Sequence, residues 1–156
     1  MALLMQIPNT ACKSKLLADL PLRAPEMARI LIVCEKDFDS DRLKTVFQQA
    51  GLASESADNV AAACESAKSG RFGVIFSSPF AGDGSWTQLI EVARRSNLSF
   101  EIVLLARTFD LNQWVEALQV GAFDVLDVLS DLRQAAEVAQ RAFSAAYLKR
   151  FRTRAN

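Results

Sequence analysis

Five short runs of apolar residues recur along the chain after residue 28, and each is bounded by polar residues, glycine or proline. Short runs rich in Ile, Leu, Val and Phe are typical of strands buried on both faces of a parallel sheet. The predicted strands cover residues 29–34, 52–57, 72–76, 101–106 and 125–129. The second is the most polar of the five, which indicates a strand at the edge of the sheet.

Between these runs the apolar residues recur every three or four positions, which is the period of an amphipathic helix. The predicted helices cover residues 39–50, 60–68, 88–95, 111–120 and 131–152. Gly51 and Gly121 follow two of them, where a C-terminal glycine is expected. Asp58 is the predicted N-cap of the second helix, and Ser130 or Asp131 is the predicted N-cap of the last.

The alternation of strands and helices predicts the α/β class. Right-handed crossovers would build a parallel five-stranded sheet with helices on both faces. A flavodoxin-like (βα)5 three-layer sandwich with strand order 2-1-3-4-5 is one common solution. No G-x-G-x-x-G motif follows the first strand and the sequence has no Walker glycine loop, which disfavours the nucleotide-binding variants of this class.

The third predicted strand leads into Ser77 and Ser78, and the chain then runs through Pro79 into a glycine-bearing loop. Chemistry in an open parallel sheet usually lies just past the carboxyl ends of the strands. This position holds two hydroxyls and no acid, histidine or cysteine. We interpret the serines as caps of backbone groups rather than nucleophiles, because no histidine is present to activate them.

The composition excludes several classes of function. With 156 residues a single domain is expected, and the formal net charge of +0 gives no general attraction to nucleic acid or anionic membranes. The count His 0 removes histidine-based catalysis and most zinc sites, which excludes many enzymes. We expect a protein that is not an enzyme and that binds neither a metal nor a cofactor. Cys12, Cys34 and Cys64 are odd in number and lie among apolar residues, which indicates reduced thiols in a cytoplasmic protein.

Residues 1–28 are predicted to form an N-terminal extension outside the fold, because Pro8, Pro21 and Pro25 interrupt their apolar patches. Two alternatives stay open: a mobile segment, or one whose leucines dock on a neighbouring surface. The extension has no signal-peptide pattern, and no window of the sequence is apolar enough to span a membrane. The predicted organisation is the extension, a domain over residues 29–150 and a basic tail over residues 151–156.

A family resemblance accompanies these patterns. From about Ala28 to Arg150 the chain resembles the receiver domain of two-component response regulators, of the chemotaxis-regulator type. The resemblance is carried by RILIVCEKD, ADNVAAA, FGVIFSSP, EIVLLAR and VGAFDVL. The last of these is similar to the family's Gly-Ala-x-x-Tyr/Phe-Leu signature before the final strand. The resemblance implies the flavodoxin-like fold and a role in signal transduction.

In that family phosphorylation needs five groups: two acids that hold Mg²⁺, an acceptor aspartate, a hydroxyl and a lysine. The resemblance assigns these roles, in the same order, to Cys34 and Glu35, Ser77, Ala106 and Val128. Only Glu35 retains the required chemistry. The aromatic residue that commonly reports activation corresponds to Val125. The resemblance therefore implies a degenerate pseudo-receiver that lacks the phosphoacceptor and acts through protein contacts.

Two other interpretations stay open. The first is a small enzyme or ligand-binding protein that uses the same crevice, with Glu35, Asp37, Ser77 and Asp83 around it. The second is a receiver whose output domain lies on a separate chain, because no DNA-reading helix pair, kinase core or diguanylate-cyclase motif accompanies it.

The last predicted helix carries Phe143, Tyr147 and Phe151 at four-residue spacing, which places them along one side. At about 1.5 Å per residue this helix would project beyond the sheet. We expect a symmetric homodimer through the fourth and fifth helices that includes Trp114. The alternatives are that the N-terminal leucines cover the aromatic residues and that Trp114 is a half-buried core residue. The basic run Lys149, Arg150, Arg152 and Arg154 suits a helix C-terminus, so nucleic-acid contact is not expected.

Overall fold

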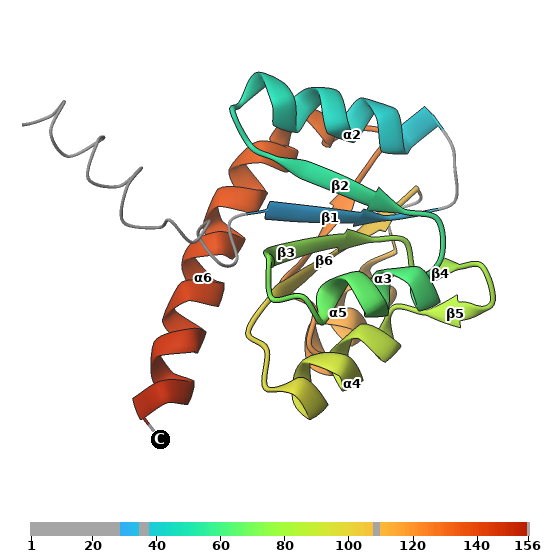
Figure 1. The fold of residues 1–156 in the computed structure, drawn as a ribbon. Helices are drawn as coiled ribbons and strands as arrows, with labels where there is room; N and C mark the ends of the chain where they lie inside the picture. The colour runs from blue at the N-terminus through green and yellow to red at the C-terminus, as the bar shows by residue number, and fades with distance from the viewer. Residues whose placement is uncertain (1–28, 35–37, 108–109, 156) are drawn as a thin grey trace, which may run out of the picture.

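The computed structural model describes residues 29–34, 38–107 and 110–155 (Figure 1). The predictions made for residues 1–28, including Cys12, and for Glu35 and Asp37 therefore lie outside the described residues. Within them no helix is both long and apolar enough to cross a membrane.

Five parallel strands form the central sheet. They are β1 (Arg29–Val33), β2 (Ser54–Ala57), β3 (Phe72–Ser77), β6 (Glu101–Ala106) and β7 (Asp124–Asp127). Their order across the sheet is β2-β1-β3-β6-β7, with every pairing parallel. This confirms the predicted flavodoxin-like order 2-1-3-4-5, and the polar second strand lies at an edge as expected.

Five α-helices connect and follow the strands. They are α2 (Phe38–Gln49), α3 (Val60–Ala67), α4 (Thr87–Ser96), α5 (Leu111–Val120) and α6 (Ala135–Ala155), with a short 3₁₀ helix, η3 (Leu132–Gln134), before the last. Gly51 and Gly121 adopt positive φ angles of 77° and 137° next to helix ends, as their predicted role requires.

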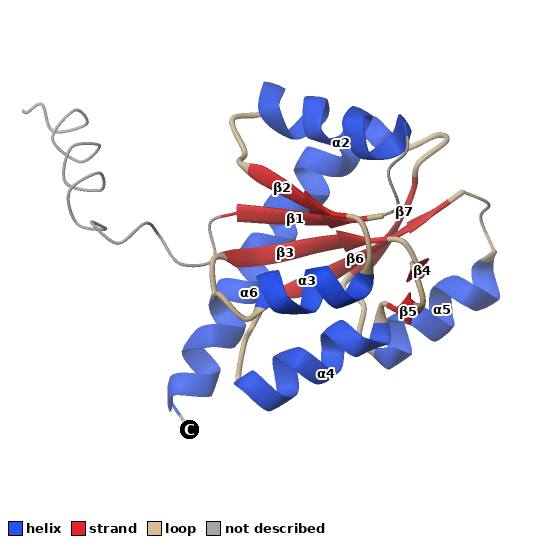
Figure 2. Cartoon of the chain, turned by 45° about the vertical axis from the view of Figure 1, so that its right-hand side comes forward, coloured by secondary structure: helices blue, strands red, loops and turns tan. Residues whose placement is uncertain are grey.

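Alternate residues of the strands supply two separate cores. Ile30 and Ile32 of β1 face α2 and α6, together with Phe47 and Phe76, whose rings lie 5.0 Å apart. Leu31 and Val33 face the opposite way, toward α3, α4 and α5. The two-residue period of a strand produces this division, so every β1 residue after Arg29 is buried. Figure 2 shows the resulting layers, with α3 and α4 in front of the sheet and α6 behind it.

Three local features differ from the sequence predictions. Asn59, not Asp58, caps α3, because its side-chain oxygen accepts from the backbone N–H of Ala62 at 2.8 Å. Neither Ser130 nor Asp131 caps α6, because η3 precedes that helix and the Asp131 side chain makes no capping hydrogen bond. The last strand ends at Asp127, since that residue's carbonyl accepts a turn hydrogen bond from the Asp131 N–H.

The loop after β3 contains a small antiparallel ladder that the sequence did not predict. Its strands are β4 (Phe80–Ala81) and β5 (Gly84–Ser85), joined through Gly82 at a φ of 71°. The ladder packs tightly against α3, because a Cβ on Gly84 would come within 2.6 Å of the Cβ of Val60. The loop that follows β3 is therefore held in place by its packing against α3.

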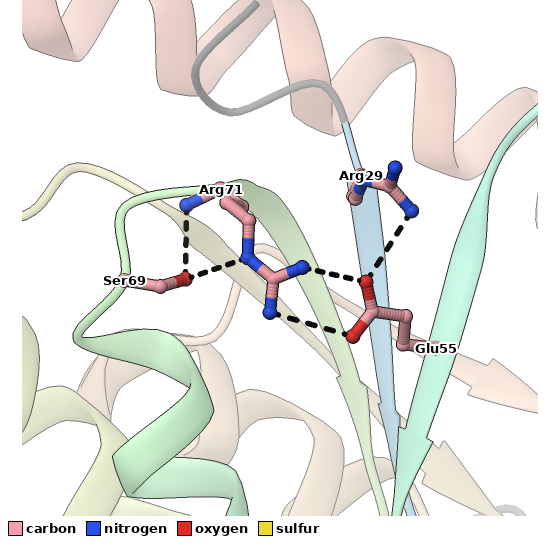
Figure 3. Close-up of polar contacts among 4 residues, drawn as sticks. All are labelled: Arg29, Glu55, Ser69 and Arg71. Atoms are coloured by element: carbon pink, nitrogen blue, oxygen red, sulfur yellow. Dashed lines mark hydrogen bonds and ion pairs between the residues drawn. The ribbon is translucent and has the colours of Figure 1, made fainter. Parts of the chain in front are cut away.

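Ion pairs join the amino ends of three strands (Figure 3). Glu55 of β2 accepts from Arg29 of β1 at 3.3 Å and from Arg71, just before β3, at 2.9 Å. Ser69 in turn accepts from the backbone N–H and the Nε of Arg71. All three charged side chains are partly exposed, so each pair is worth about 0–1 kcal/mol and aligns the strand starts rather than forming a reactive site.

Candidate functional site

The carboxyl ends of four strands bring the predicted site positions together. Cys34 follows β1, Ser77 ends β3, Ala106 ends β6 and Val128 follows β7. Backbone hydrogen bonds fix this edge: the Ser78 N–H donates to Val33 O and the Val128 N–H donates to Ala106 O, both at 2.9 Å. The structure thus assembles four of the five positions, while Glu35 lies outside the described residues.

A crevice of about 350 Å³ opens at this edge, and we call it the strand-end crevice. Its described lining consists of Cys34, Asp39, Ser78, Pro79, Leu105, Ala106, Arg107, Gln113 and Val128. The resemblance assigns the hydroxyl and the lysine to Ala106 and Val128, and both positions present hydrocarbon. At these two positions the described lining therefore offers neither a hydroxyl nor an ammonium group.

Ser77 does not line the crevice. Its side chain is completely buried, and its hydroxyl donates to the carbonyl oxygen of Ser78 at 2.7 Å. This is the backbone-capping role predicted for a serine at the end of a strand. Asp83 is exposed in the turn between β4 and β5 and does not line the crevice either. The group of Glu35, Ser77 and Asp83 is therefore not assembled by the residues that the structure describes.

An ion pair between a buried carboxylate and an exposed arginine crosses the crevice, and the sequence interpretation missed it. Asp39 lies in the first turn of α2 with only 9% of its side chain exposed, and Arg107 follows β6 directly after Ala106. The Arg107 guanidinium donates to the Asp39 carboxylate, and Arg42 lies 3.9 Å from the same group. Among the described lining residues the one carboxylate is thus neutralised from within the fold. Two sequence features could have indicated this pair: an acidic residue in the first turn of a predicted helix, and an arginine directly after a predicted strand.

The described residues offer little to a metal ion. No group of three or more cysteine, aspartate or glutamate side chains in this part of the chain could hold one. The described cysteines, Cys34 and Cys64, form no disulfide. Burial raises the pKa of the Cys64 thiol, which keeps it protonated at neutral pH.

A second hollow of about 210 Å³ lies between α5 and β7, and we call it the α5–β7 cavity. Its apolar wall includes Leu104, Trp114, Ala117 and Val125, the last at the position assigned to the activation-reporting aromatic. Four aspartates also line it: Asp110, Asp124, Asp127 and Asp131. Trp114 is half-buried, as one of the two sequence interpretations expected.

Backbone groups hold three of these aspartates in place. Asp110 caps α5 by accepting from the N–H groups of Asn112 and Gln113, and Asp124 accepts from the Val125 N–H. The hydrogen bond from the Leu129 N–H, with a second from the Ser130 hydroxyl, lowers the pKa of Asp127. Only Asp124 forms an ion pair with a described residue, at 3.8 Å from Arg141. The cavity is therefore apolar inside and predominantly negative.

The C-terminal turns of α6 project past the amino ends of the strands (Figure 1). Tyr147, Leu148 and Phe151 are 58%, 58% and 54% exposed, and the rings of Tyr147 and Phe151 meet edge to face at 4.8 Å. Phe143 instead packs partly buried against the core between α2 and α6. Of the predicted interface residues, Tyr147 and Phe151 are thus on the surface, while Phe143 and Trp114 are partly covered by the fold.

Solved structures share this architecture, although no family model and no curated protein matches the chain. The chemotaxis response regulator CheY4 of Vibrio cholerae is 22% identical, with a TM-score of 0.64 over 74% of this chain and 98% of that one. The NtrC4 receiver domain dimer is 20% identical, with a TM-score of 0.65 over 77% and 99%. The receiver domain of Ssk1, solved in a complex of Saccharomyces cerevisiae proteins with the histidine phosphotransfer protein Ypd1, is 16% identical, with a TM-score of 0.66 over 78% and 92%.

These similarities define the class of architecture. The chain has the fold of response-regulator receiver domains, as its sequence resemblance implied. Identities this low show the fold alone, and the function has to be argued from the residues at the strand ends.

Proposed function

We propose that this chain is a pseudo-receiver: a signalling module of two-component or phosphorelay type that works through protein contacts without aspartyl phosphorylation. The observation that carries the proposal is the strand-end crevice. The resemblance assigns the carboxylate, the hydroxyl and the ammonium group of the family chemistry to Ser77, Ala106 and Val128, which end or follow three neighbouring strands. None of these three side chains can fill its assigned role, and this supports the proposal.

Each replacement removes a separate requirement of phosphoryl transfer. The buried Ser77 hydroxyl already donates to a carbonyl and has no histidine to activate it as a nucleophile. Ala106 and Val128 offer no hydrogen-bond donor to a phosphoryl oxygen. The Arg107 guanidinium is engaged by Asp39. Among the residues described at this edge, no phosphoryl acceptor and no stabilising charge are therefore offered together.

The proposal is tested by incubating the protein with Mg²⁺ and acetyl phosphate and measuring its intact mass. We expect no added phosphoryl group, while a receiver domain with the acceptor aspartate serves as the positive control. An acid-labile phosphoryl adduct on this chain would overturn the proposal. A pull-down from native cytoplasm would then identify the protein partner, because we assign the chain to the cytoplasm and to partners that are proteins rather than membranes or nucleic acids.

We further propose that the receiver-like domain covers residues 29–150 and assembles as a homodimer through α5 and α6. The exposed apolar side chains of both helices support this, namely Leu111, Val115, Tyr147, Leu148 and Phe151. Phe143 and Trp114 are partly buried and would form the inner layer of this interface, behind the exposed side chains. The NtrC4 receiver is recorded as a dimer, so the fold is compatible with self-association. Residues 1–28 remain the extension, and the basic residues 151–156 continue α6 as far as Ala155.

Sedimentation equilibrium tests the dimer. We expect the full chain to be dimeric and a Tyr147→Glu, Phe151→Glu variant to be monomeric, because two charges would have to be buried in the interface. Phe80→Glu is the matched control, since Phe80 is 72% exposed in β4 and far from α6 in the chain. A monomeric wild type would favour the alternative in which the N-terminal leucines cover α6, and a dimer indifferent to both charges would refute the interface.

A second candidate function is the binding of a small ligand in the strand-end crevice. Its volume of about 350 Å³ favours this candidate, because small-molecule sites begin at about 300 Å³. Thermal-shift measurements with nucleotides, flavins and cyclic dinucleotides test it, since a ligand that binds only the native state raises the melting temperature. Stabilisation that is lost in an Arg107→Gln variant would establish the crevice as the site.

A further inference from the structure

The α5–β7 cavity combines an apolar interior with an excess of negative charge. Asp110, Asp127 and Asp131 line it without forming an ion pair with any residue that the structure describes, and Asp124 alone has Arg141. An engineered cavity of about 150 Å³ is large enough for benzene. A hollow of about 210 Å³ next to Trp114 can therefore take one aromatic ring, and its carboxylates favour a cation beside that ring.

The C-terminal end of α6 has the complementary chemistry. Tyr147, Leu148 and Phe151 are exposed there, and Arg152 is an exposed cation that forms no ion pair with another described residue. Lys149 is already 3.3 Å from Glu101, so the argument depends on Arg152. The α6 end thus presents aromatic rings next to a positive charge, while the cavity offers an apolar space next to negative charges.

The two surfaces of one molecule cannot meet. Lys149 of α6 pairs with Glu101, the first residue of β6, whereas Leu104, Leu105 and Ala106 at the other end of that strand line the cavity. At roughly 3.3 Å per residue the two sites lie on the order of 15 Å apart along β6, and α6 is a continuous helix through Ala155. The α6 end of the same molecule therefore cannot occupy the cavity, whereas the α6 end of another copy can reach it.

We infer that the α5–β7 cavity binds the α6 end of a second copy of this chain, with an aromatic ring in the apolar space and Arg152 against the aspartates. This inference rests on the proposed homodimer and specifies how it forms. A two-fold axis across the strands sets the α6 end of one copy against the cavity of the other, and symmetry repeats the contact in the opposite direction. Each dimer then contains two identical docked ends.

Charge reversal at one residue on each surface tests the contact. Asp131→Lys changes the cavity, and Asp131 is the suitable aspartate because its side chain makes no capping hydrogen bond. Arg152→Glu changes the α6 end. Each variant alone places like charges at both contacts of the dimer, so we expect its dimer dissociation constant at low salt to rise about tenfold or more. Raising the salt concentration should reduce this difference.

Mixing the two variants gives the decisive measurement. In a mixed dimer the introduced lysine faces the introduced glutamate, and the unchanged Asp131 faces the unchanged Arg152, so both contacts again pair opposite charges. An equimolar mixture should therefore recover dimers by sedimentation velocity. Asp83→Lys and Arg95→Glu are the controls, because they make the same charge changes at exposed sites on the β4–β5 turn and on α4.

The outcomes separate the inference from the proposals on which it rests. Single variants that dimerise like the controls, or a mixture that fails to recover dimers, would refute the docking while leaving a homodimer in place. A monomeric wild type would refute the homodimer and the docking together. The absence of phosphorylation is judged independently by the acetyl phosphate experiment.

Discussion

The strand-end crevice and the α5–β7 cavity share Pro79, Leu105, Ala106 and Gln113 in their walls, yet charge is arranged in them in opposite ways. In the crevice the buried carboxylate of Asp39 is paired with Arg107 inside the fold. In the cavity four aspartates face one ion-pairing cation, Arg141. In the strand-end crevice the described carboxylate is thus paired with a cation. In the α5–β7 cavity three aspartates have no ion-pair partner among the described residues, so they can attract a cation from a partner.

This difference shows what the architecture does and does not determine. The fold brings strand-end residues together whatever their chemistry, so a crevice forms at this edge although Ala106 and Val128 contribute only hydrocarbon to it. A buried charge such as Asp39 must be paired, because isolation in the interior is costly. The cavity aspartates avoid that cost, because three of them accept hydrogen bonds from backbone N–H groups and all four are at least partly exposed to solvent.

The largest expected effect comes from placing a carboxylate at Ser77, the position to which the resemblance assigns the phosphoacceptor. Ser77→Asp should reduce the free energy of unfolding by about 3 kcal/mol or more, because it would bury a charge and leave the Ser78 carbonyl without its donor. Urea denaturation at pH 7 measures the change. Ser77→Ala, which loses only the hydrogen bond, should cost about 1 kcal/mol. A fully stable Ser77→Asp protein would show that the end of β3 can accommodate an acid.

A smaller effect distinguishes the aspartates of the two hollows. Asp39→Asn removes the charge that pairs with Arg107 and should lower the free energy of unfolding by about 1–2 kcal/mol. The same change at Asp131, which has no capping hydrogen bond, should stay within about 0.5 kcal/mol. Urea denaturation of both variants, with Arg107→Gln to complete a double-mutant cycle, checks the pairing. Equal losses at the two positions would contradict the comparison.

The sheet and the location of the crevice could be predicted from the sequence because both follow from where the apolar runs begin and end. Strands buried on two faces predict a parallel sheet, and the family resemblance favours one order among its common solutions. The strand ends then place Cys34, Ser77, Ala106 and Val128 at one edge. Glycines after the helices were equally informative, because Gly51 and Gly121 take positive φ angles that other residues avoid.

The charge distribution of the site could not be predicted in the same way. Asp39 and Arg107 are 68 residues apart, and no periodicity in the sequence connects them. The choice of Asn59 over Asp58 as the N-cap depends on which side chain reaches the Ala62 N–H, since both residue types are good caps. The α5–β7 cavity likewise depends on how closely α5 packs on β7, which is a property of the folded chain and not of either segment.

The smallest expected effect concerns Asp127 and the charge state of the cavity. The Leu129 N–H and then the Ser130 hydroxyl lower the pKa of Asp127 in the folded protein. A depressed pKa stabilises the fold above the unfolded value of about 3.9, and this stabilisation is lost as the pH falls through the folded pKa. Wild type should therefore be slightly more stable than Asp127→Asn at pH 7, and the difference should disappear below about pH 4.

Urea denaturation of wild type and Asp127→Asn between pH 7 and pH 3 measures this difference. The asparagine oxygen can still accept from the Leu129 N–H, so the comparison isolates the carboxylate charge. Ser130→Ala serves as the control, because it removes the second donor to the Asp127 carboxylate. The pKa of Asp127 in the folded protein should then lie closer to its unfolded value, so the stabilisation should be lost over a narrower range of pH. A difference that is the same at pH 7 and pH 3 would mean that these hydrogen bonds do not lower the pKa of the Asp127 carboxyl in the folded protein.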